Sequence, residues 1–274
     1  MQNILQKITE SAEYLQSKGF TGATLGIVLG TGLGAFLEVM DIEQSVPYET
    51  IPHFPLATVE FHKGQLLIGK VGNTRIIAMQ GRFHYYEGYS MQEITFPVRV
   101  MKALGIEQLL LSNAAGGMNP GFKKGDLVLL DDHINLLPEN PLRGLNAPAF
   151  GNRFVDMSAP YSSTLNQKLV ATAVKTGIQL KKGVYVSVMG PNLETRAEYR
   201  YLRAAGADMV GMSTVPEVIV ANHIGLDCAA VSVITDECDP DHLQAVSIEE
   251  ILKTAQEADG RLSRLFAEMI SMQD

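Results

Sequence analysis

Residues 25–34 read LGIVLGTGLG, a mainly apolar run of five residues followed by three glycines within five positions. A short apolar run of this length is typical of a buried β-strand, and glycines directly after it indicate a tight turn. Backbone amides in such a turn can hold an anion, and Thr31 adds a hydroxyl donor. The stretch therefore predicts a strand that carries an anion-binding turn at its carboxyl end.

The same stretch is open to two other interpretations. Because Ala35 follows the third glycine, it satisfies the loose pattern of a dinucleotide-binding turn. That interpretation needs a second apolar strand ending in an acidic residue, and residues 36–50 contain none. A turn with a purely structural role is the other alternative.

On both sides of the turn, apolar runs with the length of strands alternate with stretches of helical periodicity. The further predicted strands are 66–71, 75–79, 108–111, 126–130, 184–188, 208–211 and 229–234. The predicted helices are an amphipathic N-terminal segment that stops at Gly19, followed by 91–104, 162–176, 194–205, 215–224 and 247–272. This alternation predicts one α/β domain, residues 1–274, around a mostly parallel and largely buried sheet.

Three local features refine this prediction. Gly72-Asn73 separates two predicted strands and has the composition of a tight hairpin. Pro97 lies inside a predicted helix and is expected to kink it. Residues 138–160 are rich in Asn, Pro and Gly and predict a long loop, which in compact domains is usually functional or disordered. We therefore expect a lid or a contact with a partner subunit in that loop.

The composition restricts the class of protein. Of 274 residues 46% are hydrophobic, the net charge is −8, and Lys and Arg are scattered, so we expect a large core and no nucleic-acid partner. No apolar run resembles a signal peptide or approaches the roughly 20 residues of a membrane span, so we expect no membrane partner. Cys228 and Cys238 form neither a metal pair nor a disulfide framework. The expected location is the cytoplasm.

Four more polar or glycine-bearing segments follow predicted strands, as the glycine turn does. They read GRFHYYEGY (81–89), SNAAGGMNP (112–120), GPNLET (190–195) and GMSTVPE (211–217). Each has an ordinary structural explanation, such as an aromatic cluster, close packing of small residues, a carboxylate in a first helical turn or an N-cap. Together they match a ligand crevice at the carboxyl edge of an α/β sheet. We therefore expect these segments to converge on one pocket.

The order of these motifs resembles that of the trimeric purine nucleoside phosphorylases. The resemblance rests on GTGLG, GRFHYYEGY, NAAGGMNP, DHINL, NPLRG, FGNRFVDMS, GPNLET and GMSTVPEVIVA, which span residues 30–221. It implies a nucleoside phosphorylase-like α/β fold with a central, mostly parallel mixed sheet, partly barrel-like and surrounded by helices. It also implies a homotrimer that serves purine salvage by reversible phosphorolysis of purine ribo- and deoxyribonucleosides to base and (deoxy)ribose 1-phosphate, without metal or organic cofactor.

The resemblance assigns the attacking phosphate to five residues: Thr31, Arg82, His84, Ala114 and Ser213. That family usually carries Ser where Thr31 stands, so the hydroxyl donor is kept. Ala114 would contribute its backbone amide, and Glu87 would orient the imidazole of His84. His62 lies in a segment that resembles the family's mobile loop and is expected to help close the site.

The resemblance assigns the ribose to Tyr86, Met212 and Phe154. It assigns the purine base to Leu193, Glu194 and Asp236, and catalysis to His84, Glu194 and Asp236. Phe154, in the long loop, would be contributed by a neighbouring subunit of the trimer, and Glu194 would bind N1–H of the base. The implied mechanism loosens the N-glycosidic bond first, so that phosphate stabilises and then attacks an oxocarbenium-like sugar.

Two residues depart from the family pattern. Asp236 stands where members specific for 6-oxopurines carry Asn, and an ionised carboxylate accepts hydrogen bonds without donating them. It could accept from an adenine 6-amino group or, when protonated, donate to N7 of the base. Ile248 stands where many members have a His that contacts the 5′-hydroxyl. The apolar side chain removes that hydrogen bond and resembles the methylthioadenosine phosphorylases, which accept an apolar 5′ group. A wider tolerance at the 6-amino and 5′ positions is therefore the alternative to strict 6-oxopurine activity.

Other functional classes remain to be separated by experiment. A hydrolytic nucleosidase would replace phosphate by water and leave Arg82 without a purpose. A nucleoside-binding protein without activity is a third possibility. Five residues that follow the last predicted strand can also be interpreted as a metal loop: Asp236, Cys238, Asp239, Asp241 and His242. Their spacing fits no zinc or EF-hand pattern, so we expect an acidic solvated turn and no metal.

Overall fold

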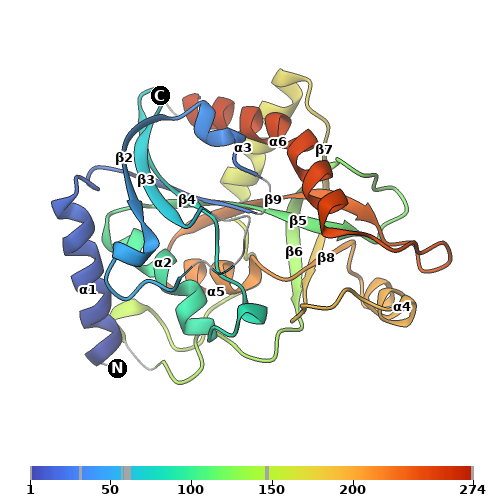
Figure 1. The fold of residues 1–274 in the computed structure, drawn as a ribbon, viewed down its shortest axis with the longest axis horizontal. Helices are drawn as coiled ribbons and strands as arrows, with labels where there is room; N and C mark the ends of the chain where they lie inside the picture. Colours follow the sequence, from blue (N-terminus) through green and yellow to red (C-terminus); the bar gives the residue numbers. More distant parts are fainter. Residues whose placement is uncertain (1, 31–32, 57, 59–62, 146–147, 273–274) are drawn as a thin grey trace.

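The computed structural model describes residues 2–30, 33–56, 58, 63–145 and 148–272. Within these residues, nine strands form one mixed sheet in the order β2-β3-β4-β1-β5-β8-β7-β6-β9. The strands are β1 (Leu25–Leu29), β2 (Asp41–Pro47), β3 (Gln65–Val71), β4 (Thr74–Gln80), β5 (Gln108–Gly117), β6 (Leu127–Asn135), β7 (Leu180–Ser187), β8 (Met209–Gly211) and β9 (Asp227–Glu237). The helices are α1 (Gln2–Ser17), α2 (Met91–Ala103), α3 (Ser163–Thr176), α4 (Arg196–Ala204), α5 (Val215–His223) and α6 (Ile248–Ser271). Figure 1 shows the sheet between helices on both sides.

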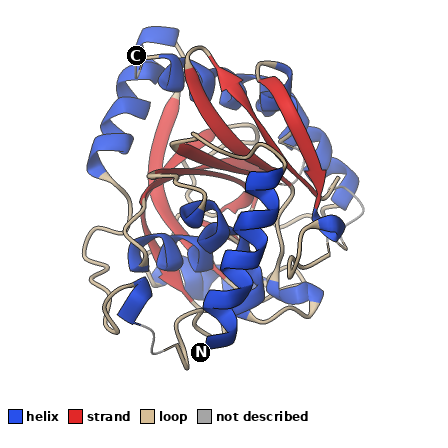
Figure 2. Cartoon of the chain, turned by 90° about the vertical axis from the view of Figure 1, so that its left-hand side faces the viewer, coloured by secondary structure: helices blue, strands red, loops and turns tan. Residues whose placement is uncertain are grey.

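Part of the sheet closes into a barrel. β5 pairs in parallel with both β1 and β9 and, at its far end, antiparallel with β8. Because β8 continues through β7 and β6 back to β9, these strands form a ring, and their curvature is visible in Figure 2. β2, β3, β4 and β1 extend the sheet on one side. The expected mixed, partly barrel-like α/β fold is confirmed.

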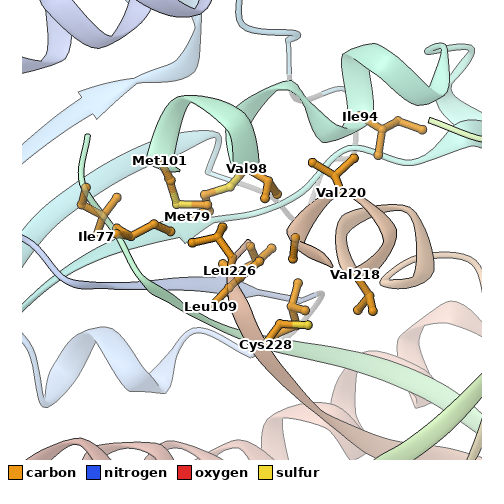
Figure 3. Close-up of a cluster of buried hydrophobic side chains, with 14 of the residues drawn as sticks. Ile77, Met79, Ile94, Val98, Met101, Leu109, Val218, Val220, Leu226 and Cys228 are labelled. Carbon is orange, nitrogen blue, oxygen red and sulfur yellow. The ribbon is translucent and has the colours of Figure 1, made fainter. Parts of the chain in front are cut away.

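Of the three apolar core clusters that the described residues form, the two larger lie on opposite faces of the sheet. Side chains alternate across a strand, so Val28 of β1 joins one cluster and Ile27 joins the other. The first cluster includes residues of α1, α2 and α5, and Figure 3 shows side chains of α2 and α5 against β4 and β5. The second cluster includes residues of α3 and α6. Among the described residues, no helix combines the length and apolarity needed to cross a membrane.

Most predicted elements are present, and helix starts follow the expected capping chemistry. Ser90, Ser162, Thr195 and Ser247 each accept a hydrogen bond from the backbone of the first helical turn, at α2, α3, α4 and α6. The helix α2 continues through Pro97. The hairpin is confirmed, since Val71 pairs with Thr74 across Gly72-Asn73.

Three sequence predictions need correction. β2 was not predicted, because it is a polar strand at the sheet edge with little apolar signal. The segment SNAAGGMNP was expected to follow its strand as a turn, but residues 112–117 belong to β5, which has a register irregularity between Ala115 and Gly116. β6 likewise extends to Asn135 rather than ending at residue 130. In β5 and β6 polar and small residues follow the apolar run, so the apolar pattern did not predict that the strand continues.

Candidate active site

A cavity of about 310 Å³ opens at the carboxyl ends of strands from the centre of the sheet. Its walls come from the ends of β4, β5, β8 and β9, from the segment after β7, and from α4 and α6. The lining residues are Arg82, His84, Tyr86, Asn113, Ala114, Ala115, Gly116, Pro191, Leu193, Glu194, Tyr199, Val210, Gly211, Met212, Ser213, Thr235, Asp236, Ile248 and Ile251. The pocket therefore collects all of the predicted strand-end segments except the described part of the glycine turn.

Arg82 supplies a buried positive charge to the pocket wall. Its side chain is 2% exposed, and its Nε donates to a carboxylate oxygen of Glu217 at 3.1 Å. One terminal nitrogen donates to the Ser112 carbonyl at 2.6 Å and to Ser213 Oγ at 3.3 Å. These acceptors hold the planar guanidinium in one orientation, and a guanidinium held in this way is able to bind an oxyanion.

His84 is held in place by Glu87, as the sequence predicted. The Glu87 carboxylate lies 2.8 Å from His84 Nδ1 and accepts from the His84 backbone N–H at 2.7 Å. Although burial works to raise the pKa of Glu87, hydrogen bonds from His84 and Thr58 keep it below its ordinary value. The carboxylate therefore stays ionised and fixes the imidazole through its Nδ1.

Tyr86 stacks on the imidazole of His84. The two ring centroids are 4.7 Å apart and the planes differ by 17°. Burial, with a smaller contribution from the charge of Glu87, raises the pKa of Tyr86 to about 12. The phenol therefore keeps its proton near neutral pH and can donate a hydrogen bond to a sugar hydroxyl.

Ser213 sits between β8 and α5 on a buried support. Its backbone N–H donates to the hydroxyl of Tyr185 at 3.3 Å, and its carbonyl accepts from Ser187 at 3.2 Å. Gly211 lets Tyr185 approach, because a Cβ at that position would lie 2.2 Å from the Tyr185 hydroxyl oxygen. The support places the Ser213 hydroxyl beside Arg82, on the same pocket wall.

The described ends of the glycine turn are also anchored. Gly30 N–H donates to Ser112 Oγ at 3.1 Å, and a Cβ on Gly30 would lie 2.7 Å from the Ser112 carbonyl oxygen. Ala35 N–H donates at 2.6 Å to Asp259, a buried residue of α6. The turn thus begins against β5, the strand that carries Ala114 into the pocket.

Two carboxylic acids, Glu194 and Asp236, also line the pocket. Asp236 is 7% exposed and accepts from the Thr235 hydroxyl at 2.8 Å and from the Cys238 thiol at 3.0 Å. Burial, reinforced by the charge of Asp236, raises the pKa of Cys238, so the thiol keeps the proton that it donates. Burial also raises the pKa of Glu194, and the nearby Asp236 adds to this effect. The pocket therefore offers one carboxyl group that accepts hydrogen bonds and a second whose pKa is raised.

The structure brings most of the predicted ligands together. The predicted residues that line the cavity are Arg82, His84, Tyr86, Ala114, Leu193, Glu194, Met212, Ser213, Asp236 and Ile248. Thr31 and His62 lie outside the described residues, so the predictions made for them remain untested. Phe154 is 88% exposed and does not line the cavity of its own chain.

Several important residues had no assigned role in the sequence analysis. Glu217 pairs with Arg82 across 135 sequence positions, and Asn113 binds Thr214 across 101. Glu217 and Asn113 both lie inside motifs quoted above. However, neither an acid in the first turn of a helix nor an amide in a strand indicates which distant residue will be its hydrogen-bond partner. Within the described ranges, no group of three or more His, Cys, Asp or Glu side chains is placed to hold a metal ion.

Comparisons with known proteins place this geometry in context. The model of the phosphorylase superfamily matches residues 24–271. Purine nucleoside phosphorylase 1 of Geobacillus stearothermophilus is 47% identical over 249 residues, 91% of each chain. Isoform 2 of the Schistosoma mansoni purine nucleoside phosphorylase, solved with cytosine and ribose 1-phosphate, has a TM-score of 0.92 at 40% identity and covers 98% of this chain and 97% of its own. A Schistosoma mansoni purine nucleoside phosphorylase solved with adenosine has a TM-score of 0.90 at 36% identity, covering 98% of both chains.

Proposed function

The chain belongs to the phosphorylase superfamily and is an enzyme of the purine nucleoside phosphorylase kind, and we propose that its cavity joins phosphate to the ribose of a purine nucleoside. The reaction is reversible phosphorolysis to a free purine and (deoxy)ribose 1-phosphate. One observation carries the proposal: Arg82, His84, Ala114 and Ser213, from separate elements, line a single cavity together with Glu194 and Asp236. Inorganic phosphate is a substrate, and the proposed reaction uses no cofactor.

At the phosphate end, each ligand has a distinct role. The Arg82 guanidinium supplies charge, and the Ser213 hydroxyl and the Ala114 amide donate hydrogen bonds. His84, fixed by Glu87, faces the junction of phosphate and ribose. Thr31 completes the set in this proposal. Because these donors are held in place before the substrate binds, little reorganisation is needed during the reaction.

The ribose lies on Met212 and receives a hydrogen bond from Tyr86 in this proposal, which places its anomeric carbon next to the phosphate. As the N-glycosidic bond lengthens, positive charge grows on the sugar and negative charge grows on the purine. Phosphate stabilises the first charge, and Glu194 with Asp236 binds the base that carries the second. Catalysis then consists of positioning and electrostatic stabilisation, without a covalent enzyme intermediate.

A second candidate specificity follows from the acids at the base end. Adenine has an acceptor at N1 and a donor at its 6-amino group, whereas hypoxanthine has a donor at N1 and an acceptor at O6. Asp236 accepts hydrogen bonds from two neighbours, and the raised pKa of Glu194 favours the protonated form that donates. A protonated Glu194 with an ionised Asp236 fits adenine, while an ionised Glu194 fits the N1–H of hypoxanthine or guanine. We therefore propose 6-oxopurine activity extended to 6-aminopurine nucleosides.

The 5′ end of the nucleoside meets an apolar wall in this proposal. Ile248 and Ile251 of α6 line the cavity, and Ile248 is 53% exposed. Such a surface offers no hydrogen bond to a 5′-hydroxyl and favours an apolar 5′ substituent. Tolerance of 5′-methylthio nucleosides, as in methylthioadenosine phosphorylases, is the corresponding expectation.

Steady-state kinetics test the reaction and its specificity together. We expect base release from inosine and guanosine only in the presence of phosphate, and measurable kcat/KM for adenosine and methylthioadenosine. As the pH falls, Glu194 gains a proton, so the ratio of kcat/KM for adenosine to that for inosine should rise. Phosphate-independent release would indicate a nucleosidase, and negligible turnover of all 6-oxopurine nucleosides would reverse the proposed order of specificity.

A homotrimer is the proposed assembly, with Phe154 completing the ribose pocket of a neighbour. Its support within one chain is the 88% exposure of this aromatic side chain in the 138–160 loop. Phe154→Ala should raise KM for inosine, whereas Val174→Ala, at a residue of α3 that is 79% exposed, should not. A monomeric mass in solution with full activity would contradict this part of the proposal. A role in purine salvage in the cytoplasm is the corresponding physiological expectation.

A further inference from the structure

A chain of buried polar side chains lies behind the hydroxyl of Ser213. Ser232 of β9 donates to Asn113 Oδ1 of β5 at 2.6 Å, and Asn113 Nδ2 donates to Thr214 Oγ1 at 2.9 Å. Thr214 Oγ1 lies 3.1 Å from Ser213 Oγ. Ser232, Asn113 and Thr214 are at most 1% exposed, and Ser232 and Thr214 do not line the cavity. These hydrogen-bonded side chains therefore connect the closed part of the sheet to the proposed phosphate site.

The backbone at Thr214 adopts an unusual conformation. Its φ is +69° and its ψ is −53°, and the Val215 N–H donates to the Ser213 carbonyl at 2.7 Å. These values describe a γ-turn with positive φ, a rare and strained turn, here centred on a β-branched residue. Strain of this kind persists where the surroundings hold it, and it concentrates at functional sites. Here the turn brings the Thr214 and Ser213 hydroxyls side by side at the start of α5.

The donors and acceptors along this chain have one consistent direction. The hydroxyl proton of Ser232 has Asn113 Oδ1 as its acceptor, which turns the amide NH₂ of Asn113 toward Thr214. Since Thr214 Oγ1 receives that hydrogen bond, its own proton is available for Ser213 Oγ. Arg82 also donates to Ser213 Oγ, at 3.3 Å. Two incoming hydrogen bonds occupy the lone pairs of a hydroxyl oxygen, so the Ser213 proton is left to point away from both donors.

We propose that Ser232, Asn113 and Thr214 form a relay that orients the Ser213 hydroxyl as a donor to phosphate. Ser232 and Thr214 are positioning residues, since they act through Ser213 without lining the cavity. The inference rests on the proposed function, in which Ser213 binds phosphate. A hydroxyl free to rotate would spend part of its time with a lone pair toward the anion, which weakens phosphate binding; the relay removes that orientation.

Two substitutions break the relay at points away from the substrate. Ser232→Ala removes the hydroxyl that sets the Asn113 amide, and Thr214→Val removes the next hydroxyl while keeping the branched shape. We expect each to raise KM for phosphate roughly tenfold, the effect of losing about one hydrogen bond to an ionised group. KM for inosine should stay within about twofold. Thr214→Ser keeps the hydroxyl, so its KM for phosphate should stay close to the wild-type value.

Matched controls separate the relay from general effects on folding. Ser11 of α1 is also fully buried and donates to the Pro52 carbonyl at 2.6 Å, so Ser11→Ala removes a comparable hydrogen bond far along the chain from the relay. It should change thermal stability without changing KM for phosphate. In a Ser213→Ala background, Ser232→Ala should have no further effect on KM for phosphate, because its action passes through Ser213.

The outcomes distinguish this inference from the proposed function. If wild-type cleavage does not depend on phosphate, the proposed function fails. If Ser213→Ala raises KM for phosphate but Ser232→Ala and Thr214→Val leave it unchanged, the relay alone is overturned. Equal increases in KM for phosphate and inosine, or additive effects of Ser232→Ala and Ser213→Ala, would likewise overturn the relay and indicate a structural role.

Discussion

Arg82, two residues after β4, and Arg99, in the middle of α2, are equally buried, each with 2% of its surface exposed. Arg82 donates to Glu217, to the Ser112 carbonyl and to Ser213. Arg99 has no hydrogen-bond acceptor for any of its three nitrogens among the described residues, and its guanidinium lies 4.8 Å from the ring centroid of Phe150. Burial lowers the pKa of Arg99 to about 10. The same residue type at the same depth thus has two different electrostatic environments.

This contrast shows what distinguishes a binding site from a buried charge. Both cations lose the hydration that they would have in water, a cost that is large unless other groups replace it. Around Arg82 an acid, a carbonyl and a hydroxyl replace it, and they leave the guanidinium facing a cavity. Around Arg99 an aromatic face provides the partial compensation of a cation–π contact. Burial therefore distinguishes neither residue. The acceptors around Arg82 and its place in the cavity wall are what favour Arg82 as a ligand in the proposed function.

Removing the Arg82 charge should give the largest effect. Arg82→Met leaves the buried Glu217 carboxylate without its cation, which we expect to lower the free energy of unfolding by about 3–5 kcal/mol. Loss of a preorganised ligand should also lower kcat/KM for phosphorolysis on the order of 10²–10³-fold. Urea denaturation and inosine kinetics at varied phosphate measure the two effects. Retained activity would show that Arg82 does not bind the substrate anion.

A double substitution separates these two contributions. Arg82→Met with Glu217→Met replaces the buried pair by apolar side chains, a change that is often neutral for stability. We expect the free energy of unfolding to return to within about 1–2 kcal/mol of the wild type, while kcat/KM stays as low as in the single variant. Recovery of activity together with stability would mean that Arg82 has a structural role alone.

The same substitution at Arg99 should act in the opposite direction. Arg99→Met removes a buried cation that has no acceptor among the described residues, so we expect the free energy of unfolding to rise by about 1–3 kcal/mol. Because Arg99 does not line the cavity, kcat/KM should change less than twofold. Substantial destabilisation would contradict the view of Arg99 as a poorly compensated charge.

The pH dependence sharpens the Arg99 prediction. Its pKa is about 10 in the folded protein against an ordinary value of 12.5, so the folded state disfavours the cation. The resulting penalty is fully present below pH 10 and is relieved as the pH rises toward 12.5. The stability advantage of Arg99→Met should therefore shrink by about 1.4 kcal/mol between pH 9 and pH 11. An advantage that is constant over this range would indicate an ordinary pKa for Arg99.

Phe150 should give the smallest effect. Phe150→Leu removes the ring next to Arg99 and should lower the free energy of unfolding by about 0.5–1 kcal/mol beyond its change in packing. In the Arg99→Met background that extra loss should disappear. Chemical denaturation of the four proteins of this cycle measures the coupling between the two residues. A coupling energy near zero would show that the cation–π contact with Phe150 does not stabilise the buried Arg99.

The sequence predicted the positions of the strands and helices far better than it predicted which strands pair with one another. Apolar runs such as 25–29 and 229–234 are strands, and helix starts coincide with Ser or Thr caps. These signals are local, because a side-chain period or a cap depends on residues a few positions apart. β2 was missed for the same reason, since an exposed edge strand needs no apolar pattern.

The site shows the same division. That Arg82, His84 and Ser213 would meet followed from the rule that strand ends share one edge of a sheet and from resemblance to a family. The residues that hold them were not predicted, because Glu217 and Thr214 become partners of Arg82 and Asn113 through contacts between distant segments. Nor did the sequence distinguish Arg99, inside a helix, from any other charged residue of that helix.

By itself the sequence determined most of the strands and helices, the segments at strand ends that carry polar groups, and the family that these motifs resemble. The tertiary structure decided how β5 pairs with β1, β8 and β9 at once, and this pairing places Asn113 next to Ser232 and Arg82 next to Ser213. The physical reason is range. Backbone preferences and side-chain periodicity act between near neighbours, whereas the environment of a buried charge is set by whichever distant residues the closed sheet brings against it.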